Sequence, residues 1–274
     1  PSSGAVEYFN HQPNDPANLG NRSVTTIFED RTGIIWFAGG LDGVDKFHPG
    51  NSFALFQHEP DNPQSLSSNP VYAIYQDEEK ALWVGTYGGG LNKLDPENGY
   101  FTAFRHNDNI SNSLSGDEIS AIRQDEDGYL WIGTVFNGLD RFDPDSGGFI
   151  HFTHNPADPN SLSADHITAL LIDDLDRVWA GTFDNGLNLY NRRTGHFTHY
   201  WFSPSDYFGI SDNHITALYQ DSEGKLWVGT WQGISILNLQ TGLFSQYHHN
   251  PLHETSLSNE VVLSFYEDEL GTMW

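Results

Sequence analysis

Histidines and carboxylates that recur at fixed intervals are the residues of this sequence whose types could indicate metal or acid–base chemistry. Five histidines occupy the same position of a repeating pattern: His11, His58, His106, His154 and His249. A metal ion needs three or four ligands within about 2.0–2.6 Å. Side chains that recur once per repeat are too far apart to converge on one ion, so we predict no metal site and no cofactor.

Catalysis requires a converging set of acids, bases or nucleophiles. A sialidase-like site would need three converging arginines, and the eight arginines of the chain show no such arrangement. The carboxylates that glycoside cleavage uses in pairs do not stand out from the repeat among 37 acidic residues. We therefore predict that the chain is not an enzyme.

Tryptophan marks the repeat and recurs every 47 or 48 residues, at Trp36, Trp83, Trp131, Trp179, Trp227 and Trp274. The unit around these tryptophans is nearly constant: a turn of type D-x-x-G, the segment L-W-x-G-T, the segment G-L-x-x-x-D-P and an aromatic segment such as YFTAFRH. A bulky side chain repeated once per period belongs to the core of a repeat protein. We expect these tryptophans to pack between neighbouring repeats and not to contact a ligand.

Each repeat holds four segments of strand length. In the second repeat they are VYAIYQD, LWVGT, GLNKLDP and YFTAFRH, which are rich in aromatic and β-branched residues. Turn-forming residues join them, so the short segments must pair antiparallel. Four strands in every repeat of about 40–50 residues are typical of β-propeller blades. We predict an all-β propeller, because the repeats of the alternative, an all-β solenoid, are shorter.

The repeats fill the chain as a single propeller region, with blades at about residues 22–58, 69–106, 117–154, 165–202 and 213–249 and a partial blade at 260–274. VEYFNH near the start matches an outer strand, and VVLSFYED predicts a sixth inner strand. We expect residues 1–274 to be part of a longer propeller of about seven or eight blades. The rival is a closed six-bladed ring, in which the N-terminal strand joins the sheet of Val262–Tyr266.

The amino-acid composition limits which partners the chain could bind, but it does not indicate the cellular compartment. The net charge is −25, from 12 basic and 37 acidic residues. An acidic surface repels phosphate, so we expect neither nucleic acid nor an anionic membrane as a partner. No apolar run approaches the roughly 20 residues that a membrane span needs. The absence of cysteine excludes disulfides and thiol chemistry.

The repeat pattern V-x-A-I-x-x-D-x-x-G-x-L-W-x-G-T-x-x-G-G-L-x-x-x-D-P resembles the two-component regulator propeller repeat over essentially the whole chain. A Ser-Leu-Ser lead-in, which generic propellers lack, strengthens the resemblance, at residues 65–67, 113–115, 161–163 and 256–258. The resemblance implies the periplasmic or extracellular sensor region of bacterial hybrid histidine kinases and of some diguanylate cyclases. It also implies a signal ligand, often an oligosaccharide in members from gut bacteria, and output kinase or cyclase domains on the same parent chain.

Positions at which the repeats differ are the candidates for function. In an antiparallel meander, the turns between second and third strands emerge on the same face as the loops between blades, and this face carries the variation. Aromatic residues stand four residues after the motif tryptophan, at Tyr87, Phe183 and Trp231, or five residues after it, at Phe136. Polar residues stand at the start of the inner strand, at Glu118, His166 and His214. We predict that these residues form a ligand-binding surface; the alternative is that the rings pack against neighbouring loops.

The loop of the fourth repeat departs most from the pattern. It reads FSPSDYFGISDN where another copy reads HNPADPNSLSAD. Trp201 precedes the loop, and Tyr207 and Phe208 are new aromatic residues in it. The loop either folds into a local apolar cluster or contacts a ligand or another subunit. We favour a contact and include Trp201 and Tyr207 in the predicted site.

Taken together, these features predict a non-catalytic sensor module of a bacterial receptor that binds a small molecule or an oligosaccharide on the variable face. The second interpretation is a protein-interaction scaffold, in which the same face or the blade edges form a homodimer. The third is a propeller enzyme that acts on a polysaccharide.

Overall fold

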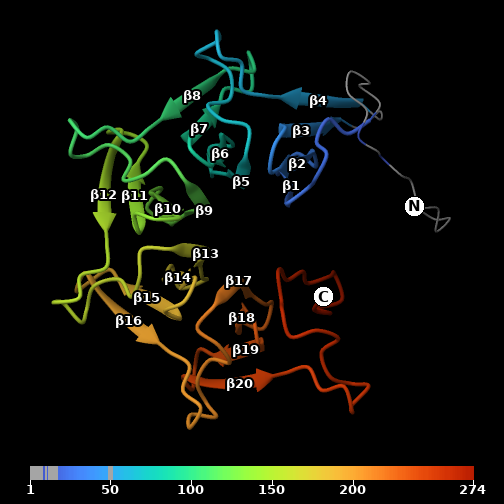
Figure 1. Cartoon of the computed structure of the whole chain (residues 1–274), viewed down its shortest axis with the longest axis vertical. Helices are drawn as coiled ribbons and strands as arrows, with labels where there is room; N and C mark the ends of the chain where they lie inside the picture. The colour runs from blue at the N-terminus through green and yellow to red at the C-terminus, as the bar shows by residue number, and fades with distance from the viewer. Residues whose placement is uncertain (1–8, 10, 12–17, 49–51) are drawn as a thin grey trace. The chain divides into compact units, whose positions relative to one another are not determined.

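The computed structural model describes residues 9, 11, 18–48 and 52–274, and in these residues it has twenty β-strands and no helix (Figure 1). The first eight strands are β1 (Thr26–Glu29), β2 (Ile35–Gly39), β3 (Gly43–His48), β4 (Ser52–Phe56), β5 (Val71–Gln76), β6 (Leu82–Thr86), β7 (Gly90–Leu94) and β8 (Phe101–Phe104). The other strands are β9 (Ile119–Gln124), β10 (Leu130–Thr134), β11 (Leu139–Asp143), β12 (Gly148–Phe152), β13 (Ile167–Ile172), β14 (Val178–Thr182), β15 (Leu187–Asn191), β16 (His196–Tyr200), β17 (Ile215–Gln220), β18 (Leu226–Thr230), β19 (Gly233–Asn238) and β20 (Leu243–Tyr247). Since these residues form no helix, they contain none that could cross a membrane.

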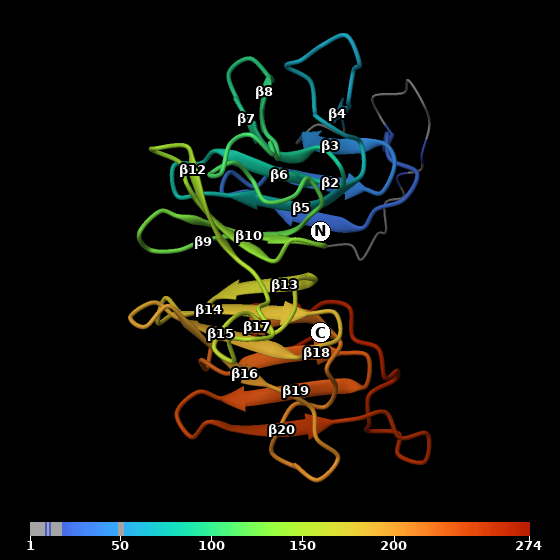
Figure 2. The same cartoon turned by 60° about the vertical axis from the view of Figure 1, so that its left-hand side comes forward.

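The strands form five antiparallel sheets of four strands, and in each sheet the spatial order of the strands follows the chain. Figure 2 shows this order clearly for β17–β20. Sheets of this kind, one in each repeat, are the blades of a β-propeller, so the predicted fold class is confirmed. We number the blades 1 to 5 in chain order.

Contacts divide the chain into two compact units. The first comprises Pro1–His106 with Asp117–Ile119, and the second comprises Asn107–Gly116 with Ser120–Trp274. Blades 1 and 2 belong to the first unit, and blades 4 and 5 to the second. Each unit is described by itself below.

The second strand of a blade is the most deeply buried. All five residues of β6, β10 and β14 are buried, whereas the outer strand β12 is mostly accessible. The glycine of L-W-x-G-T allows a close approach by the next repeat. A Cβ atom on Gly181 would lie 2.4 Å from Cγ2 of Ile215, and one on Gly85 would lie 2.5 Å from Cγ2 of Ile119. Any larger residue would therefore separate the blades.

A hydrogen bond from the indole Nε1 of the tryptophan to the aspartate six residues earlier closes each D-x-x-G-x-L-W motif. The bond lengths are 3.0 Å for Trp36–Asp30, 2.7 Å for Trp83–Asp77, 2.7 Å for Trp131–Asp125, 2.8 Å for Trp179–Asp173, 2.7 Å for Trp227–Asp221 and 3.0 Å for Trp274–Asp268. The other oxygen of the carboxylate accepts a turn N–H, as from Tyr129 to Asp125 at 2.9 Å. One side chain therefore joins the turn to the tryptophan that packs in the core.

Neighbouring blades also meet through their outer strands, where an aromatic ring contacts a phenylalanine of the next outer strand. The ring centroids are 5.3 Å apart for Phe9–Phe53, 5.8 Å for Phe56–Phe101, 6.0 Å for Phe152–Phe197 and 5.6 Å for Tyr200–Phe244. The phenylalanine N–H also donates to a carbonyl of the loop that leads into its own blade. These bonds are 2.8 Å for Phe101 to Gln64, 3.0 Å for Phe149 to Asn112, 2.8 Å for Phe197 to Asn160 and 3.1 Å for Phe244 to Phe208.

Recurring histidines hold the loops between blades. The Nδ1 atom of His58 lies 2.9 Å from the carbonyl oxygen of Leu66, and the corresponding distance from His154 to Leu162 is 2.8 Å. In both pairs the leucine is the middle residue of the Ser-Leu-Ser segment. In the part of the chain that the structure describes, no group of three His, Cys, Asp or Glu side chains could hold a metal ion.

The ends differ in part from the sequence prediction. Most of VEYFNH lies outside the described residues, and Phe9 contacts Phe53 of blade 1. The predicted sixth inner strand, VVLSFYED, is not a regular strand, so this prediction is wrong. Its pairing with residues 271–274 is limited to a short hairpin, with two backbone bonds between Tyr266 and Trp274. A strand requires a longer ladder of such pairs.

The aspartate–tryptophan bond predicts a large effect for Asp77→Ala. Asp77 and Trp83 are each 1% exposed, and the variant would leave the indole N–H and the N–H of Ala81 without an acceptor. We expect the free energy of unfolding, measured by urea denaturation, to fall by about 2–4 kcal/mol. Asp61→Ala, at an exposed turn position, is the control and should change it by less than about 0.5 kcal/mol. Equal effects of the two substitutions would contradict the structural role of the motif.

Candidate functional site

In blades 2 and 4 a backbone hydrogen bond places the variable turn beside the start of the inner strand. In blade 4 the N–H of Phe183 donates to the carbonyl of His166 at 3.0 Å, and in blade 2 the N–H of Tyr87 donates to Pro70 at 2.8 Å. Because this bond uses only backbone atoms, the two positions stay adjacent whichever side chains they carry. The side chains of the turn and of the inner strand can therefore vary while they remain neighbours.

In blades 4 and 5 the two adjacent side chains are a histidine and an aromatic residue, and their rings stack. The centroids of His166 and Phe183 are 4.8 Å apart with an interplanar angle of 9°. Those of His214 and Trp231 are 4.5 Å apart with an angle of 4°. Parallel rings at this separation attract one another beyond simple burial.

Contacts between blades join these pairs into one continuous row. Phe183 meets His214 at 5.3 Å and Trp231 at 5.6 Å, at interplanar angles of 81° and 84°. Phe136 of the preceding blade lies 6.3 Å from His166. We call Phe136, His166, Phe183, His214 and Trp231 the ring row. All five come from the predicted site, and the structure brings them together within the second compact unit.

The geometry of the ring row leaves one flat surface open. Phe183 stacks on His166 with one face, and it is perpendicular to His214 and Trp231 and almost equally distant from both. Phe183 therefore meets the edges of this stacked pair and does not cover the outer face of Trp231. The exposed fractions of Trp231 and Phe136 are 45% and 59%. Trp231 therefore keeps nearly half of its surface accessible to solvent, although one face of its ring is stacked on His214.

Two carboxylates influence the histidines of the row. The Nδ1 atom of His214 lies 3.2 Å from Oδ1 of Asp212, an ion pair when the imidazole is protonated. Burial lowers the pKa of His166 below its ordinary value of 6.5, and the negative charge of Asp184 opposes this shift. His166 therefore favours the neutral form, whose ring presents one donor and one acceptor nitrogen.

The first compact unit holds two other predicted site residues, and they are neighbours. Tyr87 and Glu118 form an isolated antiparallel bridge. The ring of Tyr87 also lies 5.8 Å from that of Tyr72, a residue of β5. Both rings are partly accessible, with exposed fractions of 41% and 48%.

Trp201 and Tyr207 lie apart from the ring row, at the outer strands of blades 4 and 5. Trp201 follows β16 directly, and its ring lies 5.0 Å from that of His199. Tyr207 precedes Phe208, whose carbonyl accepts the N–H of Phe244 in β20. Tyr207 is 80% exposed, so the loop does not enclose it in a local apolar cluster.

Sequence reasoning missed Asp212 and Tyr72. The sequence did contain a signal for Asp212, because the equivalent residues of other repeats carry no negative charge. These residues are Ser68, Gly116, Ala164 and Asn259. Asp212 is therefore a carboxylate unique to its repeat, next to a variable histidine. Tyr72 belongs to an ordinary strand pattern, and only the register of β5 brings its ring to Tyr87.

The sheets and the aspartate–tryptophan motif are those of a β-propeller built from sequence repeats. The variable residues of each repeat lie at the turn between second and third strands, and in the second compact unit they form the ring row. The family described as "Two component regulator propeller" matches residues 18–40, 65–88, 113–136 and 209–232. The four matched segments are thus two component regulator propeller repeats. No curated protein matches its sequence.

Solved structures show the same fold. The extracellular domain of the putative hybrid two component system BT3049 from B. thetaiotaomicron has a TM-score of 0.71 and 21% identity, over 93% of this chain and 38% of that chain. Virginiamycin B lyase from Staphylococcus aureus has a TM-score of 0.65 and 15% identity, over 89% of this chain and 73% of that chain. PorZ from Porphyromonas gingivalis has a TM-score of 0.64 and 15% identity, over 90% of this chain and 36% of that chain. The chain thus spans less than two fifths of the length of the BT3049 domain and of PorZ.

Stability should distinguish the ring row from the core. Trp131 is completely buried, and Trp131→Ala should lower the free energy of unfolding by about 3–5 kcal/mol. Trp231→Ala removes a ring that is 45% exposed and should cost less than half as much in the same denaturant titration. Equal losses for the two variants would make Trp231 a core residue and would remove it from the candidate site.

The lowered pKa of His166 predicts a pH dependence of stability. The unfolded chain takes up a proton near pH 6.5, before the folded protein does, so protonation favours unfolding as the pH falls. The contribution of His166 to stability is thus present above pH 6.5 and is lost as the pH falls through the folded pKa. His166→Phe keeps a ring and removes the titration, so its stability should fall less than that of the unmodified protein between about pH 6.5 and 5. Urea titrations across this range test the difference, and parallel curves would contradict it.

Proposed function

We propose that this chain is the ligand-sensing propeller of an extracytoplasmic receptor in bacterial signal transduction, and that the ring row binds its signal molecule. The observation that carries the proposal is the stacking of His214 on Trp231, which leaves the outer face of Trp231 open. The four segments that match the two component regulator propeller repeat and the likeness to extracellular domains of putative hybrid two component systems support the receptor context.

An oligosaccharide suits the chemistry of the row. The C–H face of a pyranose packs on a flat ring, and its hydroxyl groups need directional partners at the ring edges. Asp212 and the imidazole nitrogens of His214 and His166 supply such partners beside the rings. An immobile aromatic surface reduces the entropy lost on binding, because the stacked partners already hold the rings in place.

A protein-interaction scaffold is the second candidate, and the outer-strand loop of blade 4 favours it. Tyr207 and Phe208 expose 80% and 63% of their surface, and adjacent exposed rings are typical of contact surfaces. This loop is separate from the ring row in the second compact unit. The two candidates therefore make different predictions for substitutions at the two places.

Catalysis is the third candidate. Virginiamycin B lyase shares the fold at 15% identity, a likeness that extends to the fold alone. The proposal is a receptor without catalysis, and turnover of any bound glycan would contradict that part of it.

Binding to an array of glycans and peptides tests the proposal. We expect a glycan to bind, and Trp231→Ala to weaken its binding at least tenfold in a calorimetric titration, as loss of an interface aromatic does. Tyr207→Ala is the matched control, an exposed aromatic outside the ring row, and should leave glycan binding unchanged. Peptide binding that Tyr207→Ala abolishes and Trp231→Ala leaves intact would favour the scaffold and overturn the sensor proposal.

A further inference from the structure

The segments that form and adjoin the ring row carry negative charges and no basic residue. They are the turns at 134–137, 182–185 and 230–232, the starts of inner strands at 164–166 and 211–214, and the corresponding segment 259–261. They contain no lysine or arginine, and their acidic residues are Asp165, Asp184, Asp212 and Glu260. Asp165 is used by the fold, because its Oδ1 atom accepts the N–H of His154 at 2.6 Å.

Asp212 combines burial with an oxygen that has no partner. The residue is 8% exposed, and its Oδ1 atom lies 3.2 Å from the backbone nitrogen and 3.2 Å from Nδ1 of His214. Within the residues that the structure describes, its Oδ2 atom accepts no hydrogen bond. A buried carboxylate is unfavourable unless donors surround it, so a donor from a ligand would stabilise this oxygen.

Asp184 and Glu260 lie close to the aromatic turns. Asp184 follows Phe183 directly in the same turn and is exposed. The carbonyl of Glu260, which is also exposed, accepts the N–H of Gly233 at 2.7 Å, and Gly233 is two residues after Trp231. Both turns therefore lie in a region of negative potential, which favours a cation.

The basic residues of the second compact unit do not offset these charges. They are Arg123, Arg141, Arg177, Arg192, Arg193 and Lys225. The last four lie in turns between first and second or between third and fourth strands, at the opposite ends of the strands from the ring row. The guanidinium of Arg141 packs over the ring of Tyr129 at 4.6 Å, and that of Arg123 donates to the carbonyl of Ile122. An anionic ligand at the row would therefore meet no lysine or arginine of this unit.

The histidines of the row do not offset the negative charges either. Burial lowers the pKa of His166 below its ordinary value of 6.5, so this imidazole is neutral at neutral pH. A protonated His214 would form an ion pair with Asp212, and these two charges would balance. Asp184 and Glu260 would still carry negative charge.

Accessible aromatic rings add a second attraction for a cation. Trp231 and Phe136 expose 45% and 59% of their surface. An ammonium group within about 6 Å of an aromatic ring is attracted by its π electrons, most strongly by those of tryptophan. A neutral sugar gains packing and hydrogen bonds at such a site, whereas a sugar with an ammonium group also gains charge interactions.

Given that the ring row binds the signal molecule, as proposed above, we propose that this ligand is a cationic sugar, an amino sugar whose nitrogen is not acylated. Its ring packs on Trp231, and its ammonium group donates to Oδ2 of Asp212. His214 contacts both residues, at 4.5 Å between ring centroids and at 3.2 Å to the carboxylate, so one oligosaccharide can reach both. The carboxylates select against an anionic sugar by repulsion.

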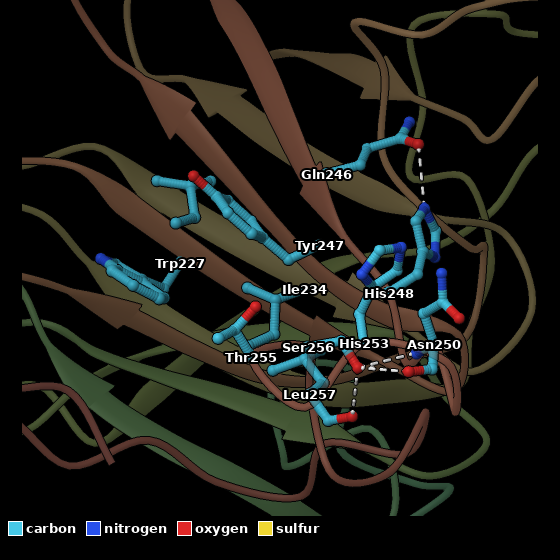
Figure 3. Close-up of a pocket in the computed structure, with 11 residues that line it drawn as sticks. Trp227, Ile234, Gln246, Tyr247, His248, Asn250, His253, Thr255, Ser256 and Leu257 are labelled. Carbon is cyan, nitrogen blue, oxygen red and sulfur yellow. Dashed lines mark hydrogen bonds between the residues drawn. The ribbon is translucent and has the colours of Figure 1, made fainter.

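A second opening with aromatic side chains has a different charge. It lies beside β20, has a volume of about 590 Å³, and includes Trp227 and Tyr247 in its lining (Figure 3). Its lining contains no aspartate or glutamate. A neutral sugar suits this pocket, whereas an ammonium group would find no carboxylate in it. Tyr247 therefore provides a control for the place of binding.

Two oligosaccharides of the same linkage test the proposal by calorimetric titration. The β-1,4-linked tetramers of glucosamine and of glucose differ only at C2, which carries an ammonium group in one and a hydroxyl group in the other. We expect the glucosamine tetramer to bind at least about fivefold more tightly, as an added charge pair beside an aromatic ring implies. Asp212→Asn keeps the size of the side chain and should reduce the ratio of the two affinities below about twofold. Equal affinities for the unmodified protein, or tighter binding of the glucose tetramer, would overturn the proposal and leave glycan binding at the row intact.

Matched variants show whether the charge acts at the ring row. Asp145→Asn removes an equal charge from an exposed residue between β11 and β12, at the other end of the strands, and should leave the ratio unchanged. Trp231→Ala should weaken binding of both tetramers, and Tyr247→Ala should weaken neither. If Trp231→Ala leaves binding of the glucosamine tetramer unchanged, or Tyr247→Ala abolishes it, the cation binds elsewhere and the proposal is wrong. A chain that binds neither tetramer would contradict the proposed function as well.

Spermidine distinguishes an amine ligand from an amino sugar, since it carries ammonium groups but no sugar ring. Because it has no flat face to pack on Trp231, we expect it to displace the glucosamine tetramer only at higher concentrations than the tetramer itself requires. Spermidine that binds more tightly than the tetramer, and loses this affinity in Trp231→Ala, would make the ligand a polyamine and overturn the proposal.

Discussion

The hydrogen bond between the motif tryptophan and the aspartate six residues before it is the contact on which the repeated architecture depends. A buried carboxylate is unfavourable unless donors surround it, and here the indole and the turn N–H groups do so. Because the indole nitrogen is held from one side, the flat faces of the ring remain free to pack between blades. Trp131 shows the result, since it donates to Asp125, stacks on Phe152 of its own blade at 5.4 Å and meets Tyr190 of the next blade at 5.2 Å. Turn, strand and packing between blades are thus coupled through one side chain.

The aspartate–tryptophan contact lies at the turn between first and second strands. The turn between second and third strands is at the other end of the second strand, so its side chains can vary without affecting this contact. In blade 4 the backbone bond from Phe183 to His166 and the hydroxyl of Thr182, which bonds Asn185 and Gly186, hold the turn between second and third strands. These contacts do not use the ring of Phe183, so the side chain at this position can vary. Two stacked pairs in adjacent blades, His166 with Phe183 and His214 with Trp231, form the ring row, and Phe183 joins them because it contacts both rings of the second pair.

Sequence reasoning succeeded where a residue's neighbours are set by the repeat and failed where they depend on a particular loop. Five of the nine predicted site residues lie in one row, because all occupy the start of the inner strand or two adjacent positions of the turn between second and third strands. Trp201 and Tyr207 were grouped with them only because they are aromatic and variable, yet they lie beside the outer strands β16 and β20. Asp212 was overlooked, although its contact with His214 at 3.2 Å follows from a spacing of two residues. Residues 261–268 match a strand pattern but have too few pairing partners to form one.

The amino-acid sequence by itself determined the strand order, the antiparallel pairing, the turn chemistry and the identity of the core tryptophans. These features are local or recur with the repeat, so the pattern of a single period is sufficient to predict them. The tertiary structure alone decided how the variable rings are oriented: His214 stacks on Trp231, while Phe183 meets the edges of both. The physical reason is that ring orientation depends on contacts between different blades, whose distances and angles are set by packing and not by spacing along the chain.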